Sequence, residues 1–205
     1  NETTREWTDG IYQYDSDGTL IKSWSTPIDV TLGSMAIDTE NGWLYISSYG
    51  GRIFRSNLNG MVFEEWTTVD ALCVPSMDVD ASGYLYAAVG PPWWYKGEWQ
   101  VRKVHPNGTI VKSWGSYGSG PDQFNEVSGI AIDKKNGYVY ISDTANTVDF
   151  PGRLDRIAKF TTEGDYLTSL PDGFNQPRGV AVDADGFVYV SDTDNNRIQK
   201  FDPNG

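Results

Sequence analysis

Acidic side chains are the most numerous groups in this sequence that could hold a metal ion. The chain has 28 aspartates and glutamates against 16 lysines and arginines, and its formal net charge is −12. Carboxylate oxygens are the ligands that calcium prefers in proteins. The aspartates of the long inter-strand segments are therefore candidate calcium ligands, foremost Asp143, Asp192 and Asp194, with Asp149 and Asp155 as further candidates.

These aspartates lack the spacing of a dedicated calcium site. None of the segments carries the Asp-x-Asp-x-Asp-Gly pattern of a calcium loop. Aspartate also stabilises turns by hydrogen bonding to nearby backbone N–H groups, and this role explains most of these positions better. We therefore expect calcium to be the one possible cofactor, and no other cofactor is indicated.

Aromatic side chains gather in two long segments that could contact a partner. Residues 90–99 hold four of them, and residues 143–153 hold a fifth; the candidate contact residues are Trp93, Trp94, Tyr95, Trp99 and Phe150. Flat rings with one polar edge stack on sugars or serve as protein-binding hot spots when a loop presents them. The alternative is that they cover the edge of a neighbouring sheet.

The sequence offers few groups for covalent or acid–base catalysis. His105 is the only histidine and Cys73 the only cysteine. A zinc site with several histidines is excluded, and so is an internal disulfide. Cys73 follows the apolar residues Ala71 and Leu72, which favours a buried and unreactive thiol.

Several features bear on where the chain acts and what it avoids. The negative charge is spread singly and disfavours nucleic-acid binding, which depends on neutralising phosphates. No apolar run approaches the roughly 20 residues that span a bilayer, so we expect no membrane insertion. The sequons at Asn1 and Asn107 are glycosylation candidates. We expect an acidic extracellular or cell-surface protein.

A fourfold internal repeat shows which elements must position these residues. The same strand pattern ends in an aspartate at Asp38, Asp80, Asp133 and Asp183, spaced by 42, 53 and 50 residues. Periods of this length are typical of propeller blades or of long solenoid units. In each copy a glycine turn leads to a second strand in which aromatic and aliphatic residues alternate, as in a strand buried on both faces.

Each repeat continues into a second hairpin. Its turn ends in glycine at Gly18, Gly60, Gly108 or Gly164, and a large apolar residue follows six positions later: Trp24, Trp66, Trp114 and Leu170. This register predicts an outer strand, so each repeat is a four-stranded antiparallel sheet. The fold class is therefore all-β, a β-propeller of about four to five blades with essentially no helix.

The last repeat carries a specific resemblance. Residues 179–183, 186–192 and 195–202 together resemble an NHL repeat, and residues 129–160 are close to it. The first two copies are more divergent, since Ser48 and Val89 replace the aspartate that follows serine in the motif. The resemblance implies a propeller of the six-bladed, TolB-like type. We interpret residues 195–197 as structural, with Arg197 tying a loop to a neighbouring strand.

The repeats do not close a ring on their own. We expect one propeller domain over residues 1–205, with partial repeats at 10–24 and 178–205 and full repeats at 33–66, 75–114 and 128–170. Both ends supply the third strand of a blade. The sequence therefore predicts either part of a longer chain or a partial ring completed by another subunit as a homo-oligomer or filament.

These observations favour a non-enzymatic module that binds protein or glycan, or that assembles with itself. The alternative is part of a divalent-metal-dependent lactonase or lyase, because some related propellers are such enzymes. Lactonase-like relatives use Glu, Asn and Asp around one ion, and Glu126, Asn125 and Asn175 lie in suitable segments. No motif matches closely enough to transfer a role to them, and we expect no catalytic residue.

Overall fold

The computed structural model describes residues 10–25, 31–91, 97–144, 155–171 and 173–203. Within these residues the secondary structure is β-strand except for one 3-10 turn, Thr193–Asn195, which the sequence did not predict. The expected all-β class is confirmed. No helix in the described part is long and apolar enough to cross a membrane.

Three complete blades form the middle of the chain, each with its strands in sequence order. The first blade holds β3 (Leu32–Asp38), β4 (Trp43–Ser48), β5 (Arg52–Asn57) and β6 (Phe63–Thr68). The second holds β7 (Cys73–Val79), β8 (Leu85–Gly90), β9 (Gln100–Val104) and β10 (Ile110–Trp114). The third holds β13 (Val127–Asp133), β14 (Tyr138–Asp143), β15 (Arg156–Thr161) and β16 (Tyr166–Ser169). All neighbouring strands within these sheets are antiparallel.

Smaller sheets flank the three blades. The hairpin of β1 (Gly10–Tyr14) and β2 (Leu20–Ser25) precedes them. A three-stranded last blade follows, with β17 (Pro177–Val182), β18 (Val188–Asp192) and β19 (Arg197–Phe201). A short parallel pair, β11 (Ser116–Tyr117) and β12 (Gln123–Phe124), lies between the second and third blades. The sequence did not predict this pair.

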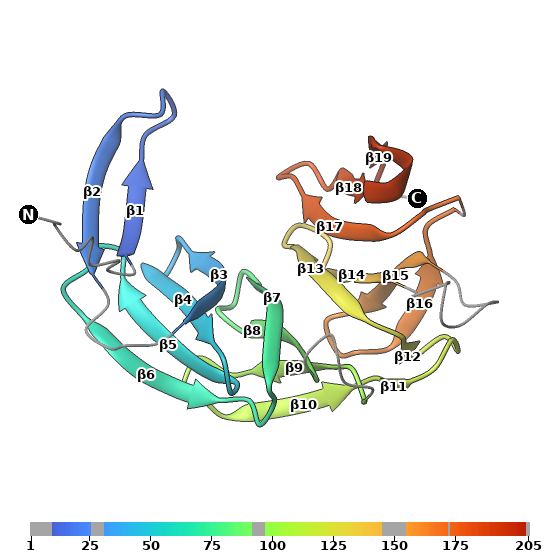
Figure 1. The fold of residues 1–205 in the computed structure, drawn as a ribbon, viewed down its shortest axis with the longest axis horizontal. Coiled ribbons are helices and arrows are strands. Elements are labelled where there is room, and N and C mark those ends of the chain that lie inside the picture. The colour runs from blue at the N-terminus through green and yellow to red at the C-terminus, as the bar shows by residue number, and fades with distance from the viewer. Residues whose placement is uncertain (1–9, 26–30, 92–96, 145–154, 172, 204–205) are drawn as a thin grey trace, which may run out of the picture.

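The sheets stand around a common axis as an open arc. Figure 1 shows the N-terminal hairpin and the last blade at the two ends of this arc. The first strands of successive blades pack side by side, β3 on β7, β7 on β13 and β13 on β17. These strands line the axis, as the first strand of a propeller blade does.

Apolar cores between the blades hold the arc together. Tyr45 of the first blade packs with Leu85 of the second, and Tyr86 of the second packs with Phe160 of the third. Strands β4, β8 and β14 are buried almost throughout, which confirms the expectation that the second strand is covered on both faces. In β18 burial alternates, because one face of the last blade is open.

Candidate interaction surface

A buried ion pair fixes the loop that leads into the third blade. Asp143, fully buried at the end of β14, accepts hydrogen bonds from the backbone N–H groups of Asn125 at 2.7 Å and Glu126 at 3.4 Å. Its Oδ2 lies 3.1 Å from Nε of Arg156. The Arg156 guanidinium also donates to the carbonyl oxygens of Gly120 and Gln123. Burial raises the pKa of Asp143 to about 6, although these donors oppose the rise.

The last blade repeats this arrangement in a more exposed setting. Asp192 accepts a hydrogen bond from the backbone N–H of Asn175 at 2.7 Å and one from Nε of Arg197 at 2.7 Å. Arg197 also donates to the carbonyl oxygen of Gly173, which confirms that it ties a loop to a strand. Burial raises the pKa of Asp192, but its donors, including Asn195, outweigh burial and lower it overall.

These contacts favour the turn-stabilising role over calcium binding for Asp143 and Asp192. The oxygens of Asp143 and Asp192 are already bound by N–H donors, because each carboxylate organises its own loop. Asp194 is exposed in the 3-10 turn, away from any such group. The part of the chain that the structure describes holds no cluster of three His, Cys, Asp or Glu side chains suited to a metal. Asp149 lies outside the described residues.

Two glycines bring the loops of the first and second blades together. Gly50 and Gly51 have φ angles of 85° and 71°, which side chains disfavour. The backbone N–H of Gly50 donates to the carbonyl of Leu72, and that of Val69 donates to the carbonyl of Gly51. A Cβ on Gly51 would lie 2.6 Å from the carbonyl oxygen of Ala71, so the close approach requires glycine.

This approach creates two adjoining hollows that share Leu72. One, of about 370 Å³, is lined by Tyr49, Cys73 and Val74, among others. The other, of about 290 Å³, is lined by Asp70, Pro91 and Gly97, among others. Tyr49 is 58% exposed and Leu72 49% exposed. We call the two hollows with Tyr49 and Leu72 the loop-face surface.

The predicted contact residues differ in where they lie, and most of them fall outside the described residues. Trp93, Trp94 and Tyr95, and likewise Phe150 and Asn1, lie outside the described residues. Trp99 is only 7% exposed and packs in the core between the second and third blades. The expectation that Trp99 is presented to a partner is therefore wrong. Gly90 has no side chain, and the indole of Trp99 packs in the space that a Cβ on Gly90 would occupy.

Single residues with expected roles lie as follows. Cys73 is half-buried rather than buried, and burial raises the pKa of its thiol, which disfavours the reactive thiolate. Asn107 is exposed in an outer turn. His105 in the same turn packs its ring edge-on against Tyr84.

The residues weighed for a lactonase-like site have different surroundings. The amide of Asn125 is buried, and its Nδ2 and Oδ1 find no hydrogen-bond partner among the described residues. Glu126 is half-buried, and burial raises its pKa. Asn175 is exposed and contributes its backbone N–H to Asp192.

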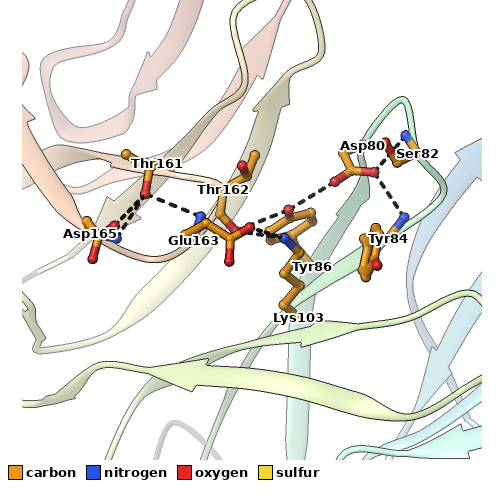
Figure 2. Close-up of polar contacts among 9 residues, drawn as sticks. All are labelled: Asp80, Ser82, Tyr84, Tyr86, Lys103, Thr161, Thr162, Glu163 and Asp165. Carbon is orange, nitrogen blue, oxygen red and sulfur yellow. Dashed lines mark hydrogen bonds and ion pairs between the residues drawn. The ribbon is translucent and has the colours of Figure 1, made fainter.

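A repeated contact between blades joins a lysine, a tyrosine and a turn (Figure 2). Lys103 lies 4.7 Å and 5.5 Å from the ring centroids of Tyr84 and Tyr86. Its ammonium donates to the carbonyl of Thr162 at 3.1 Å and pairs with Glu163 at 2.7 Å. Thr162 and Glu163 belong to the turn 161–164 of the next blade. We call the lysine and the two aromatic rings beside it the socket.

The third blade forms an equivalent socket. Lys159 lies 4.0 Å from the ring centroid of Tyr138 and 5.4 Å from that of Tyr140. Its ammonium donates to the carbonyl of Pro203 in the last blade at 3.4 Å, the position that Thr162 holds in its own turn. Sequence reasoning missed the socket. Its signal is a cation two residues before each turn after the first: Arg55, Lys103, Lys159 and Lys200.

Comparisons with known proteins agree with this architecture. The model of the NHL repeat family matches residues 174–201. NHL repeat-containing protein 3 of Mus musculus is 28% identical over 188 residues. The chain is thus a β-propeller that carries an NHL repeat. The aligned part is 82% of this chain and 51% of the mouse protein, so the chain spans about half the length of this NHL-repeat relative.

Solved structures share this fold at low sequence identity. A protein of unknown function from Bacteroides thetaiotaomicron superimposes with a TM-score of 0.71 and 16% identity, covering 95% of this chain and 54% of that one. A chain in the crystal structure of a nidogen/laminin complex has a TM-score of 0.68 and 15% identity, covering 89% and 64%. These similarities show the fold alone.

Proposed function

We propose that this chain is a non-catalytic module that binds another protein through the loop-face surface. The observation that carries the proposal is the exposure of Tyr49 and Leu72 beside two adjoining hollows. Tyrosine at the centre of a contact offers a large apolar area and a polar tip at low entropic cost. The hydrogen bonds of Gly50 and Val69 hold the loops beneath these side chains.

Pro91 and Gly97, which line the second hollow, flank residues 92–96 in the sequence. We propose that Trp93, Trp94 and Tyr95 take part in the same contact. The same rings could stack on sugar, so the partner we propose is a protein or a glycosylated protein. We propose that it acts outside the cell or at its surface, where an exposed Asn107 would be available for glycosylation.

A photo-crosslinking experiment tests the loop-face surface. A photoreactive phenylalanine analogue replaces Tyr49 in one variant and Met61 in a control variant, since Met61 is 84% exposed on an outer turn. Both are exposed to the secreted proteins of the source cells. We expect a discrete crosslinked product from position 49, absent from position 61, that excess unlabelled wild-type chain abolishes and excess Leu72→Asp chain does not.

Two results would contradict the proposal. One is the same set of crosslinked products from both positions, which would indicate random collision. The other is competition by Leu72→Asp as strong as that by the wild type, which would place the contact elsewhere. Mass spectrometry of the crosslinked product identifies the partner, and enzymatic deglycosylation of that product shows whether sugar lies in the contact.

A further inference from the structure

The second blade lacks an ion pair that ties a loop to a strand in the blades after it. In the third blade Asp143 at the end of the second strand pairs with Arg156 at the start of the third strand, and the last blade repeats this pair. The corresponding residues of the second blade are Val89 and Gln100, since Gln100 precedes the socket lysine by three residues, as Arg156 does. Neither of them carries a charge.

Two further replacements change the packing beneath this loop. Phe124 is fully buried and packs with Ala158 in the core between the second and third blades. The second blade has Ala71 at the position of Phe124, nine residues before the aspartate of the repeat, and Arg102 at the position of Ala158, directly before the socket lysine. An aromatic ring is thus lost and a guanidinium is gained.

The four replaced residues all line the second hollow of the loop-face surface: Ala71, Val89, Gln100 and Arg102. This hollow, of about 290 Å³, therefore lies where the third blade has its ion pair and its buried phenylalanine. Its lining comes from the second blade and the segment that enters it from the first, so the hollow lies within the arc. It is a feature of this one repeat.

Among the third-strand arginines that the structure describes, Arg102 alone has no ion pair. The others each pair with a carboxylate: Arg52, Arg55, Arg156 and Arg197. Arg102 is half-buried, and its Nη1 donates to Oγ of Ser113 at 3.3 Å. Its Nε is buried and has no hydrogen-bond partner among the described residues. A buried charged donor without an acceptor is costly, so an acceptor placed in the hollow would bind.

A carboxylate is the acceptor that fits this donor. A guanidinium presents its Nε and Nη donors in one plane, and a carboxylate accepts two of them. In the third blade the carboxylate of Asp143 accepts Nε of Arg156 and the backbone N–H of Asn125. Leu72, which corresponds to Asn125, also lines the second hollow. Residues 92–96 contain no aspartate or glutamate that could supply the carboxylate.

Two acidic residues of the lining restrict which anions fit. Asp70 and Glu98 are exposed, and the structure shows no ion pair between Arg102 and either of them within its described residues. Their charges repel a phosphate group more strongly than a single carboxylate. They favour a carboxylate whose neighbours in the partner are neutral or basic.

We infer that the second hollow receives an aspartate or glutamate side chain of the partner protein, and that Arg102 binds its carboxylate. The segment that carries this side chain is otherwise neutral or basic. That the carboxylate belongs to a protein rests on the proposed function of the loop-face surface. That the hollow binds a carboxylate rests only on Arg102 and its surroundings.

Nuclear magnetic resonance of the arginine side chains tests the hollow without a partner. The 205-residue chain is labelled with isotopic arginine, and the Nε–Hε signal that is missing from Arg102→Lys is assigned to Arg102. Sodium propionate is the probe, because it is the glutamate side chain without its backbone. Propionamide, which has the same shape and no charge, and sodium phosphate are compared with it at equal ionic strength.

We expect propionate to shift the Arg102 signal saturably. Half-saturation should come at a concentration at least about tenfold lower than for the signal of Arg52, which is already paired with Glu65. Propionamide should leave the Arg102 signal in place, and phosphate should shift it only at higher concentration than propionate.

Three results of this titration would overturn the inference. One is an Arg102 signal that propionate does not move. Another is saturation by phosphate at lower concentration than by propionate. The third is a signal that ignores propionate but moves in Asp70→Asn or Glu98→Gln, which would show that Arg102 pairs with a carboxylate of its own chain.

Competition in the crosslinking experiment tests where the carboxylate comes from. Excess Arg102→Gln chain should compete for the product at position 49 at least about tenfold less well than the wild type, whereas the matched control Arg52→Gln should compete as the wild type does. The melting temperature of Arg102→Gln should not fall, because its buried Nε has no partner to lose among the described residues. Removing the sugars from the secreted proteins beforehand should leave the product intact.

The outcomes separate this inference from the proposed function. Without a discrete product at position 49 the proposed function fails, and the propionate titration still reports on the hollow. A discrete product for which Arg102→Gln competes as well as the wild type overturns the inference alone. A product that disappears when sugars are removed assigns the carboxylate to a sugar acid and overturns the inference as well.

Discussion

Asp143 and Asp192 hold the same place in successive repeats, yet their surroundings move their pKa values in opposite directions. Each accepts a loop N–H and an arginine Nε. The side chain of Arg156 is 10% exposed and that of Arg197 is 49% exposed. The third blade is covered by its neighbours, so desolvation outweighs the hydrogen bonds at Asp143 but not at Asp192.

This difference predicts a pH dependence of stability. The pKa of Asp143, about 6, lies above the ordinary value of 3.8, so the folded chain binds more protons between these values. Its contribution is complete below pH 4 and is lost as pH rises through 6. We expect the free energy of unfolding of the wild type, relative to Asp143→Asn, to fall over that range in urea titrations. A difference that rises with pH would contradict this prediction.

Asp192 provides the control of opposite sign. Its lowered folded pKa gives stability that is present above the unfolded pKa and is lost as pH falls through the folded value. Asp192→Asn should therefore differ most from the wild type near neutral pH. Carboxyl carbon NMR titration checks both residues directly, with Asp143 titrating near 6 and Asp192 below 3.8.

At the scale of the element, the outer turns meet two structural requirements. Each must reverse the chain at a glycine with positive φ, and each must fit against the preceding blade. A Cβ built on Gly164 would lie 2.7 Å from Cδ2 of Trp114, and one on Gly60 would lie equally close to Trp24. The tryptophan six residues after a turn glycine is thus the surface on which the turn of the next blade packs.

A pair of substitutions separates the conformational requirement from the packing requirement. Gly137→Ala strains a turn with a φ of 73° and open space around it, so we expect a cost of about 1–2 kcal/mol. Gly164→Ala adds a clash with Trp114 at a φ of 79°, so we expect it to cost about 1–3 kcal/mol more. Urea unfolding measures both. Equal losses of unfolding free energy in the two variants would show that Trp114 moves to accommodate the added methyl group.

Sequence patterns predicted the elements better than their surroundings. The repeat at Asp38, Asp80, Asp133 and Asp183 and the turn glycines were enough to define three four-stranded blades, because turn chemistry and alternation are local properties. Whether Trp99 faces a partner or a core depends on Gly90 in the neighbouring strand, which alternation within one segment does not show. The socket joins different blades, so only alignment of the repeats would have revealed it.

At the scale of the whole molecule, each blade contacts only its neighbours along the arc. In such repeat structures stability is a sum of the units and their interfaces. The second and third blades have two covered faces, whereas the hairpin β1–β2 packs through one small cluster with Ile11, Leu44 and Ile46. The ends should therefore open more readily than the middle.

Hydrogen exchange measured by mass spectrometry tests this gradient. At a concentration where light scattering gives a single chain, we expect the amides of β8 and β14 to exchange slowest and those of β1 and β2 fastest, with β17–β19 between them. The difference in opening free energy should be several kcal/mol. Uniform protection over all strands would show instead that the arc unfolds as one cooperative unit.

Near-identical sockets create a problem during folding, because a turn could enter the wrong one. Glu163 and Asp17 are the only acidic third residues among the turns, and the others at this position are Asn59, Asn107 and Asn204. If a turn with asparagine at this position entered the second blade, Lys103 would lose its ion pair with Glu163 and keep only a bond to a backbone carbonyl, as Lys159 does. The charge of the third turn residue thus favours the correct order of blades over misassembled ones.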